Sequence, residues 1–197
     1  MRTTGYCPAC GELYELSAEE PYLCRSCRQK RPPWASFAFF GAYSGLLRDL
    51  LLRFKFGPDY GCCAALGYLL YEAYLARCPT APDLIAAVPL QGDRLKRRGF
   101  NQSLELAVQL GRRTKIRVER SALEKQRSTS EQSALPRKER LSNLAGAFAV
   151  RKDKVRGKNV LLVDDVATTG ATLAACSKEL IAGKAARVDV ICLARAS

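Results

Sequence analysis

The chain has 197 residues, of which 32 are lysine or arginine and 19 are aspartate or glutamate, and it contains no histidine. A chain of this length can hold one medium domain plus a small module that depends on a metal ion for its stability. The missing histidine excludes histidine-based catalytic triads, metal ligands and proton relays, so any catalysis must rely on positioning and charge.

Four cysteines near the start of the chain form two Cys-x-x-Cys pairs. Cys7 pairs with Cys10 and Cys24 pairs with Cys27, and the short spacing lets each pair bend into a knuckle. Four thiolates suit tetrahedral Zn²⁺ with no open coordination position, which predicts a structural zinc site. Two disulfides are an alternative, but the odd total of nine cysteines and the lack of an apolar leader in residues 1–10 disfavour them. Iron in the same cage is the other alternative.

Pro32 and Pro33 indicate a boundary, because consecutive prolines hold an extended link that cannot continue a helix. We therefore expect a zinc knuckle module over residues 1–33 and a second domain over residues 34–197. The longest uncharged stretch, residues 34–47, is too short and too interrupted by glycine to span a bilayer. These features predict a soluble, cytoplasmic protein with no membrane insertion.

Beyond the linker, short apolar runs typical of buried strands alternate with apolar residues at helical spacing. This alternation predicts a mostly parallel α/β sheet flanked by helices, with ligands at the carboxyl ends of the strands. Asn101 can cap one helix, in which Leu104, Ala107, Val108 and Gly111 share a face. The expected strands cover residues 37–43, 84–88, 147–150, 160–163 and 188–193, and the expected helices cover residues 46–54, 64–75, 101–111 and 171–181.

Positive charge is concentrated in one third of the chain. Residues 94–158 hold 19 basic against 6 acidic side chains, whereas the remainder holds 13 of each. This surplus indicates a polyanion partner, and one small diphosphate uses only a few of these charges, which favours nucleic acid. Aromatic residues are scarce there, which favours sequence-neutral binding of single-stranded DNA; a solvated basic face is the alternative. The candidate DNA-binding residues are Arg94, Lys96, Arg97, Arg98, Arg127, Arg137, Lys138 and Arg140.

The most specific motif lies at residues 160–172, which read VLLVDDVATTGAT. An apolar strand ends at Asp164 and Asp165, and a turn of small residues then opens a helix. Backbone N–H groups at that helix N-terminus can surround a phosphate, which Gly170 lets approach the backbone closely. The two carboxylates repel phosphate, so the ligand must offer neutral hydroxyls or a metal at its other end, as a ribose 5-phosphate does. The candidate phosphate-binding residues are Ala167, Thr168, Thr169, Gly170, Ala171 and Thr172.

An alternative for this motif is a strand end at which Asp165 only caps a turn. The full pattern of four apolar residues, two acidic residues and Thr-Thr-Gly instead resembles the phosphoribosyl pyrophosphate (PRPP) signature of the type I phosphoribosyltransferases. The resemblance implies that Asp164 and Asp165 face the ribose hydroxyls and that residues 167–172 hold the 5-phosphate. A transfer reaction would also need Mg²⁺ on the diphosphate and a loop that grips pyrophosphate. The candidates for that loop are Pro89, Leu90 and Arg94.

Further segments extend the resemblance over nearly the whole chain. Residues 94–103 read RLKRRGFNQS, and Gln132 and Leu135 form a Gln-x-x-Leu element. Together with the cysteine pairs and the 160–172 motif, they resemble the ComF family, competence-associated proteins of DNA uptake that include GntX-type relatives. That resemblance implies a phosphoribosyltransferase fold with a zinc module, which handles internalised single-stranded DNA with a helicase partner.

One segment departs from this family. After Lys55 the family tends to carry an aromatic residue and then Gly-Asp, whereas here Pro58 separates Gly57 from Asp59. The sequence therefore leaves the roles of Lys55 and Asp59 undecided.

Two functions of different classes follow from these residues. The preferred one is a DNA-handling protein of natural transformation that binds single-stranded DNA and uses PRPP as a structural or regulatory ligand. The other is an active phosphoribosyltransferase that transfers ribose 5-phosphate from PRPP to a base or amine. A PRPP-controlled transcriptional regulator is a weaker third function, because the sequence lacks a helix-turn-helix pattern.

Overall fold

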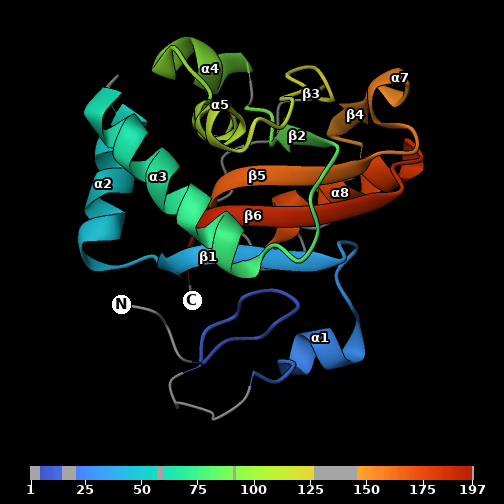
Figure 1. Ribbon diagram of the computed structural model, residues 1–197, viewed down its shortest axis with the longest axis horizontal. Helices are drawn as coiled ribbons and strands as arrows, with labels where there is room; N and C mark the ends of the chain where they lie inside the picture. The colour runs from blue at the N-terminus through green and yellow to red at the C-terminus, as the bar shows by residue number, and fades with distance from the viewer. Residues whose placement is uncertain (1–4, 15–20, 57–59, 91, 127–145, 197) are drawn as a thin grey trace.

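Four parallel strands form the central sheet of the protein. A computed structural model describes residues 5–14, 21–56, 60–90, 92–126 and 146–196. Every pair of neighbouring strands in this sheet is parallel, which confirms the predicted mostly parallel α/β fold (Figure 1). The strand order is β1-β6-β5-β2, with β1 at Ser36–Ala42, β2 at Leu84–Ala87, β5 at Asn159–Ala167 and β6 at Arg187–Arg195.

Helices cover both faces of the sheet (Figure 1). Along β5, Leu161 and Val163 join the core on one face, and Val160 and Leu162 join the core on the other. Because both faces are buried, the strands read as continuous apolar runs, which is why the sequence reveals them. One face packs against α2 (Gly45–Phe56), α3 (Tyr60–Arg77) and α5 (Gln102–Thr114), and the opposite face packs against α8 (Ala171–Ala182).

Two predicted elements differ from the structure. A strand does form within the predicted residues 147–150, at residues 148–150, but it pairs antiparallel with a second short strand in a separate two-stranded sheet. Arg94, which the sequence places in a candidate pyrophosphate loop, lies instead in a short helix over residues 92–98, since leucine, lysine and arginine are good helix formers. The elements involved are β3 (Leu123–Lys125), β4 (Phe148–Val150) and α4 (Gly92–Arg98); two further short helices are α1 (Arg25–Gln29) and α7 (Lys152–Val155).

The cap of α5 is confirmed, but its buried face is shifted. The side chain of Asn101 accepts hydrogen bonds from the backbone N–H groups of Ser103 and Leu104, at 3.0 and 3.4 Å. Leu106 and Leu110 are fully buried, whereas Leu104 and Val108 are only half-buried. The helix is therefore rotated relative to the predicted face, and this rotation turns Ser103 toward the sheet.

The N-terminal segment docks beside β1 at the edge of the sheet (Figure 1). We call its described residues, 5–14 and 21–33, the cysteine module. The ring of Tyr6 meets Phe39 of β1 edge to face, with 5.3 Å between centroids. The guanidinium of Arg77, at the end of α3, lies 4.4 Å from the Tyr6 ring and 4.5 Å from the Phe39 ring. The module is thus packed onto the domain by aromatic and cation–π contacts.

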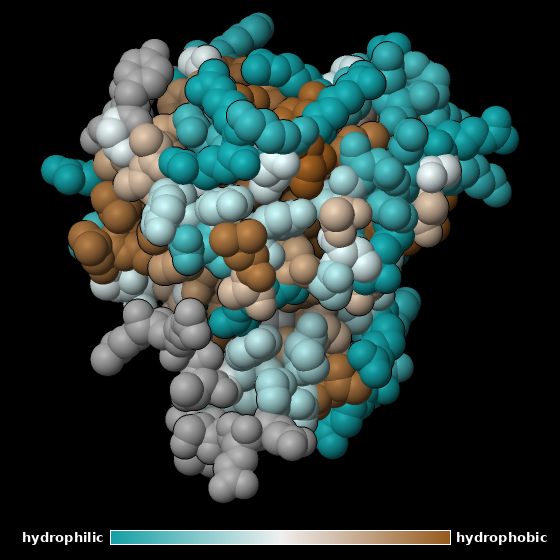
Figure 2. All heavy atoms as spheres, in the orientation of Figure 1, coloured by the Kyte–Doolittle hydropathy of each residue, from teal (hydrophilic) through white to brown (hydrophobic). Residues whose placement is uncertain are grey.

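Hydrophilic side chains cover much of the face seen in Figure 2, especially over α4 and around β4 and α7, and apolar side chains appear only in scattered patches. Within the described residues, no helix combines the length and apolar character needed to cross a membrane.

Candidate functional site

The candidate phosphate-binding turn lies between β5 and α8, and we call it the phosphate turn. The strand continues to Ala167, so Asp164 and Asp165 lie near the end of the strand and not in the loop after it. Gly170 precedes α8 with a φ of 74°, a left-handed conformation that other residues adopt only with strain. A Cβ at Gly170 would also lie 3.4 Å from Trp34. The turn therefore has the helix N-terminus and the glycine that the motif predicts.

The two carboxylates of the motif have different partners. Asp164 accepts a hydrogen bond from the Ser103 hydroxyl at 2.8 Å and another from the backbone N–H of Asp165 at 2.9 Å. Asp165 forms an ion pair with Lys55, whose Nζ lies 3.3 Å from its Oδ2. Both side chains of that pair are mostly buried, with 22% and 16% of their surface exposed. Lys55, whose role the sequence left undecided, therefore belongs to this site.

Burial raises the pKa of Asp164 to about 7, and the neighbouring negative charge of Asp165 adds to the rise. The hydrogen bonds from Ser103 and from the Asp165 backbone, and the charge of Lys55, act in the opposite direction. Asp164 therefore changes its charge near neutral pH. A carboxyl group of this kind can accept or release a proton at little cost in free energy. Its oxygens can also accept a hydrogen bond from a ribose hydroxyl.

The segment at residues 94–103 supports this acidic pair from the side. Besides capping α5, Asn101 donates from its side-chain amide to the carbonyl oxygen of Val88, directly after β2. Phe100 packs against Phe54 of α2, with 5.4 Å between ring centroids, next to Lys55. The segment thereby joins the ends of β2, α2 and β5. Ser103 was missed as a site residue by sequence reasoning, although it belongs to a motif that was recognised.

The candidate pyrophosphate loop lies at the same edge of the sheet. Val88 donates from its backbone N–H to Val163 at 3.0 Å, so Pro89 and Leu90 follow at the end of the strand next to the acidic pair. Arg94 falls in α4, and its side chain is outside the described part of the structure. The role of Pro89, Leu90 and Arg94 in gripping pyrophosphate stays a prediction.

The candidate DNA-binding residues are only partly described. Lys96 is exposed on α4, and Arg98 donates to the side chain of Gln102 at 3.2 Å. The backbones of Arg94 and Arg97 lie in the same helix, but their side chains are not described. The other four lie outside the described residues: Arg127, Arg137, Lys138 and Arg140.

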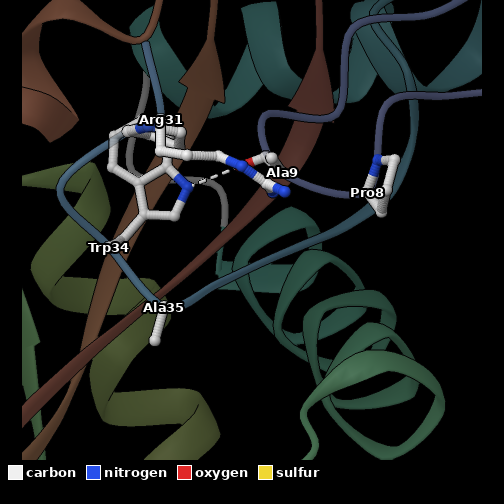
Figure 3. Close-up of a pocket in the computed structure, with 6 residues that line it drawn as sticks. Pro8, Ala9, Arg31, Trp34 and Ala35 are labelled. Carbon is white, nitrogen blue, oxygen red and sulfur yellow. Dashed lines mark hydrogen bonds between the residues drawn. The ribbon is translucent and has the colours of Figure 1, made fainter. Parts of the chain in front are cut away.

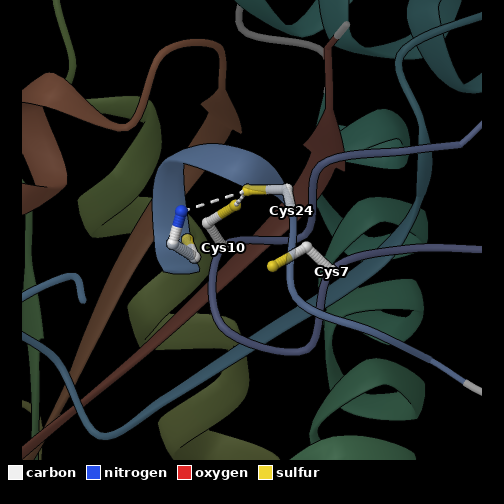
Figure 4. Close-up of side chains that lie close together, drawn as sticks. Cys7, Cys10 and Cys24 are labelled. Atoms are coloured by element: carbon white, nitrogen blue, oxygen red, sulfur yellow. Dashed lines mark hydrogen bonds between the residues drawn. The ribbon is translucent and has the colours of Figure 1, made fainter. Parts of the chain in front are cut away.

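The four cysteines of the module form one cluster, and all their Sγ atoms lie within 4.8 Å of one another (Figure 4). Cys24 caps α1, and its sulfur accepts from the backbone N–H of Cys27 at 3.4 Å. The Sγ atoms of Cys10 and Cys24 are 3.7 Å apart, whereas a disulfide requires about 2 Å. Burial raises the pKa of the Cys24 thiol, and a bound cation would hold this sulfur as a thiolate. The donor set fits a tetrahedral ion such as Zn²⁺.

The cysteine module and the phosphate turn are joined by one buried side chain. Arg195, at the end of β6, donates from Nε to the carbonyl oxygen of Cys10 at 3.1 Å. Its Nη1 donates to the carbonyl oxygen of Ala167 at 3.0 Å and also to that of Thr168. A knuckle of the cysteine cluster is therefore tied to both residues that open the turn.

Comparison with known proteins agrees with this arrangement. The phosphoribosyl transferase domain family matches residues 61–197. The DNA utilization protein YhgH of Escherichia coli is 38% identical over 194 residues, which cover 96% of this chain and 83% of that protein. Competence protein F of Haemophilus influenzae is 36% identical over 202 residues, covering 100% and 87% of the two chains. Competence protein ComFC of Bacillus subtilis is 30% identical over 209 residues, covering 98% and 80%.

Solved structures are more distant. Adenine phosphoribosyltransferase from Leishmania donovani is 15% identical, with a TM-score of 0.45, and the match covers 83% of this chain and 84% of that one. On the evidence of its close relatives and of the matched domain, the chain belongs to the ComF family of competence proteins and carries a phosphoribosyltransferase-type domain.

Proposed function

We propose that the protein is a competence-type DNA-handling protein that binds PRPP and single-stranded DNA during natural transformation. The observation that carries the PRPP half is the acidic pair of Asp164 and Asp165 next to a glycine-bearing turn at the N-terminus of α8. A phosphate fits the turn and neutral hydroxyls fit the carboxylates, and a ribose 5-phosphate offers both. The DNA half is supported by the surplus of positive charge and by the names of the relatives.

The ion pair between Lys55 and Asp165 offsets one of the two negative charges at this site. In this proposal, PRPP enters with Mg²⁺, which neutralises much of the charge of its diphosphate. The cluster of Cys7, Cys10, Cys24 and Cys27 holds one structural Zn²⁺, which stabilises the cysteine module. A helicase of the DNA-uptake machinery is the proposed protein partner.

A second function is favoured by a specific observation. Asp164 lies buried beside Asp165, and this burial raises its pKa to about 7, which would let it exchange a proton near neutral pH, as acid–base catalysis requires. The alternative is therefore an active phosphoribosyltransferase that transfers ribose 5-phosphate to a base or amine.

Incubation of the protein with PRPP, Mg²⁺ and a panel of bases and amines separates the two functions. The preferred function predicts that PRPP binds without release of pyrophosphate. Pyrophosphate release that depends on one acceptor, and that is lost in Asp164→Asn, would establish the enzyme instead.

A further inference from the structure

A cleft of about 630 Å³ lies between α8 and the cysteine module, outside the ribose-facing carboxylates. One wall of the cleft, which we call the α8 bank, is formed by α8 and the turn before it. The other wall, which we call the module bank, is formed by α1 and the linker that follows it. The residues that line it are Cys10, Ser26, Cys27, Gln29, Lys30, Arg31, Pro32, Pro33, Trp34, Thr169, Gly170, Ala171, Ala174, Lys178 and Arg195.

The charge of this cleft has one sign. Lys30 and Arg31 are exposed on the module bank, Lys178 is exposed on the α8 bank, and none of the described lining residues is acidic. Arg195 is different, because its buried guanidinium is already bonded to backbone carbonyls. The cleft therefore has three exposed cations, spread over both banks, and this charge favours an anionic ligand.

The lining between these cations is largely apolar. It includes Pro32, Pro33, Trp34 and Ala174. A small anion would use only the charges, whereas a single DNA strand offers phosphates to the cations and unpaired base faces to the apolar surface. A duplex hides those faces. We propose that this cleft binds single-stranded DNA.

A second hollow extends the surface beyond the linker (Figure 3). Its volume is about 440 Å³, and it shares Arg31, Pro32 and Trp34 with the first cleft. Trp34 is fixed there by a hydrogen bond of 2.7 Å from its indole N–H to the carbonyl oxygen of Ala9. The linker thus lines two neighbouring hollows, and a lining of this extent suits a chain of nucleotides better than one compact ligand.

The cleft and the proposed PRPP site share Thr169, Gly170 and Ala171. The carboxylates of Asp164 and Asp165 repel a DNA backbone, so the strand runs along α8 and leaves the ribose site to PRPP. This inference rests on the proposed function, because it names where the proposed DNA partner binds. It moves the principal contacts from the basic segment at residues 94–158 to the cysteine module and α8.

The test compares two triple variants of the full-length protein. The cleft variant carries Lys30→Ala, Arg31→Ala and Lys178→Ala. The control carries Arg25→Ala, Arg28→Ala and Arg156→Ala, which removes three exposed charges outside the cleft, two of them from the same module. Binding of a labelled oligothymidine is titrated at several salt concentrations, and the zinc content of each protein checks its fold.

We expect the cleft variant to lose at least about tenfold in affinity at low salt, and its salt slope to fall by about 2, since each phosphate contact on a single strand contributes about 0.7. The control should bind like the wild type. If the wild type binds and the two variants bind equally well, the cleft is not the DNA site, although the proposed function survives. If the wild-type protein binds no DNA, both the proposed DNA site in the cleft and the proposed DNA-binding function are wrong.

Two further measurements do not depend on the variants. Light-induced crosslinking of an oligonucleotide that contains bromodeoxyuridine should attach it to the peptide that holds Trp34, and attachment only to residues 92–98 would overturn the proposal. Polyglutamate should compete far less well than oligothymidine. Equal competition by polyglutamate, or equal affinity for duplex DNA, would contradict recognition of unpaired bases.

Discussion

Arg195 donates a hydrogen bond to the carbonyl oxygen of Cys10, a residue 185 positions away in the sequence. The same guanidinium donates to Ala167 at the start of the phosphate turn. Cys10 belongs to the proposed zinc cluster, so the position of the metal knuckle and that of the turn depend on each other.

Zinc removal should therefore weaken PRPP binding. Coupling between two sites is reciprocal, so PRPP should protect the zinc from a chelator by the same factor, which we expect to be about five- to tenfold. Arg195→Gln should bring this factor close to one, whereas Arg187→Gln, at the other end of β6 and paired with Asp189, should not change it. PRPP affinities that are equal with and without zinc would show that the two sites are independent.

Cys7→Ser and Cys24→Ser should each lower the zinc content below one ion per chain and expose residues 1–33 to protease. A missing thiolate removes binding free energy that the small module cannot replace with apolar packing. Cys78→Ser, on a half-buried residue outside the cluster, is the control. Metal analysis of the purified proteins measures the zinc content per chain. Full zinc retention in both cluster variants would exclude the proposed four-cysteine zinc site.

Gly170→Val should abolish PRPP binding, because valine disfavours a φ of 74° and its side chain would meet Trp34. Asp164→Asn together with Asp165→Asn should weaken binding without abolishing it, since the amides still bond hydroxyls and repel phosphate less. Gly157→Val, at another glycine with positive φ, controls for general strain. Calorimetric titration distinguishes these effects, and unchanged affinity in Gly170→Val would contradict the turn assignment.

Asp164 should make the free protein less stable as the pH rises. Its folded pKa, about 7, lies above the ordinary value of 3.8, so its contribution to stability is complete below about pH 4 and is lost as the pH rises through 7. Asp164→Asn should therefore stabilise the protein relative to the wild type by about 2 kcal/mol more at pH 8 than at pH 5.5. Denaturant unfolding at both pH values measures this difference, and its absence would show that Asp164 titrates normally.

The basic helix α4 gives a separate expectation. Because the proposed cleft makes the principal contacts with DNA, replacing Lys96, Arg97 and Arg98 together by alanine should weaken DNA binding and flatten its salt dependence less than the cleft variant does, with no change in zinc content. Equal affinity in this variant would leave α4 as a solvated charged face.

The strands, the cap at Asn101 and the cysteine pairs were predictable because each is a local pattern. The partners of the acidic pair were not. Lys55 meets Asp165 only because α2 packs on the same face of the sheet as α5, and Ser103 meets Asp164 only because α5 is rotated to bury Leu106 and Leu110. No spacing in the sequence encodes that rotation or the strand order.

The link through Arg195 was unpredictable for the same reason. Its partners come from the first and the last parts of the chain, and nothing near Arg195 in the sequence indicates a turn or a metal knuckle. Residues 147–150 show the reverse case: the strand was predictable from its apolar run, but its pairing with β3 instead of the main sheet was not.

The most direct test is calorimetric titration of the zinc-loaded wild-type protein with PRPP in the presence of Mg²⁺. The proposed site predicts one PRPP bound per chain, with binding lost in Gly170→Val. Absence of PRPP binding by the wild type, or equal binding by Gly170→Val, would contradict the assignment of residues 164–172 as a phosphoribosyl site.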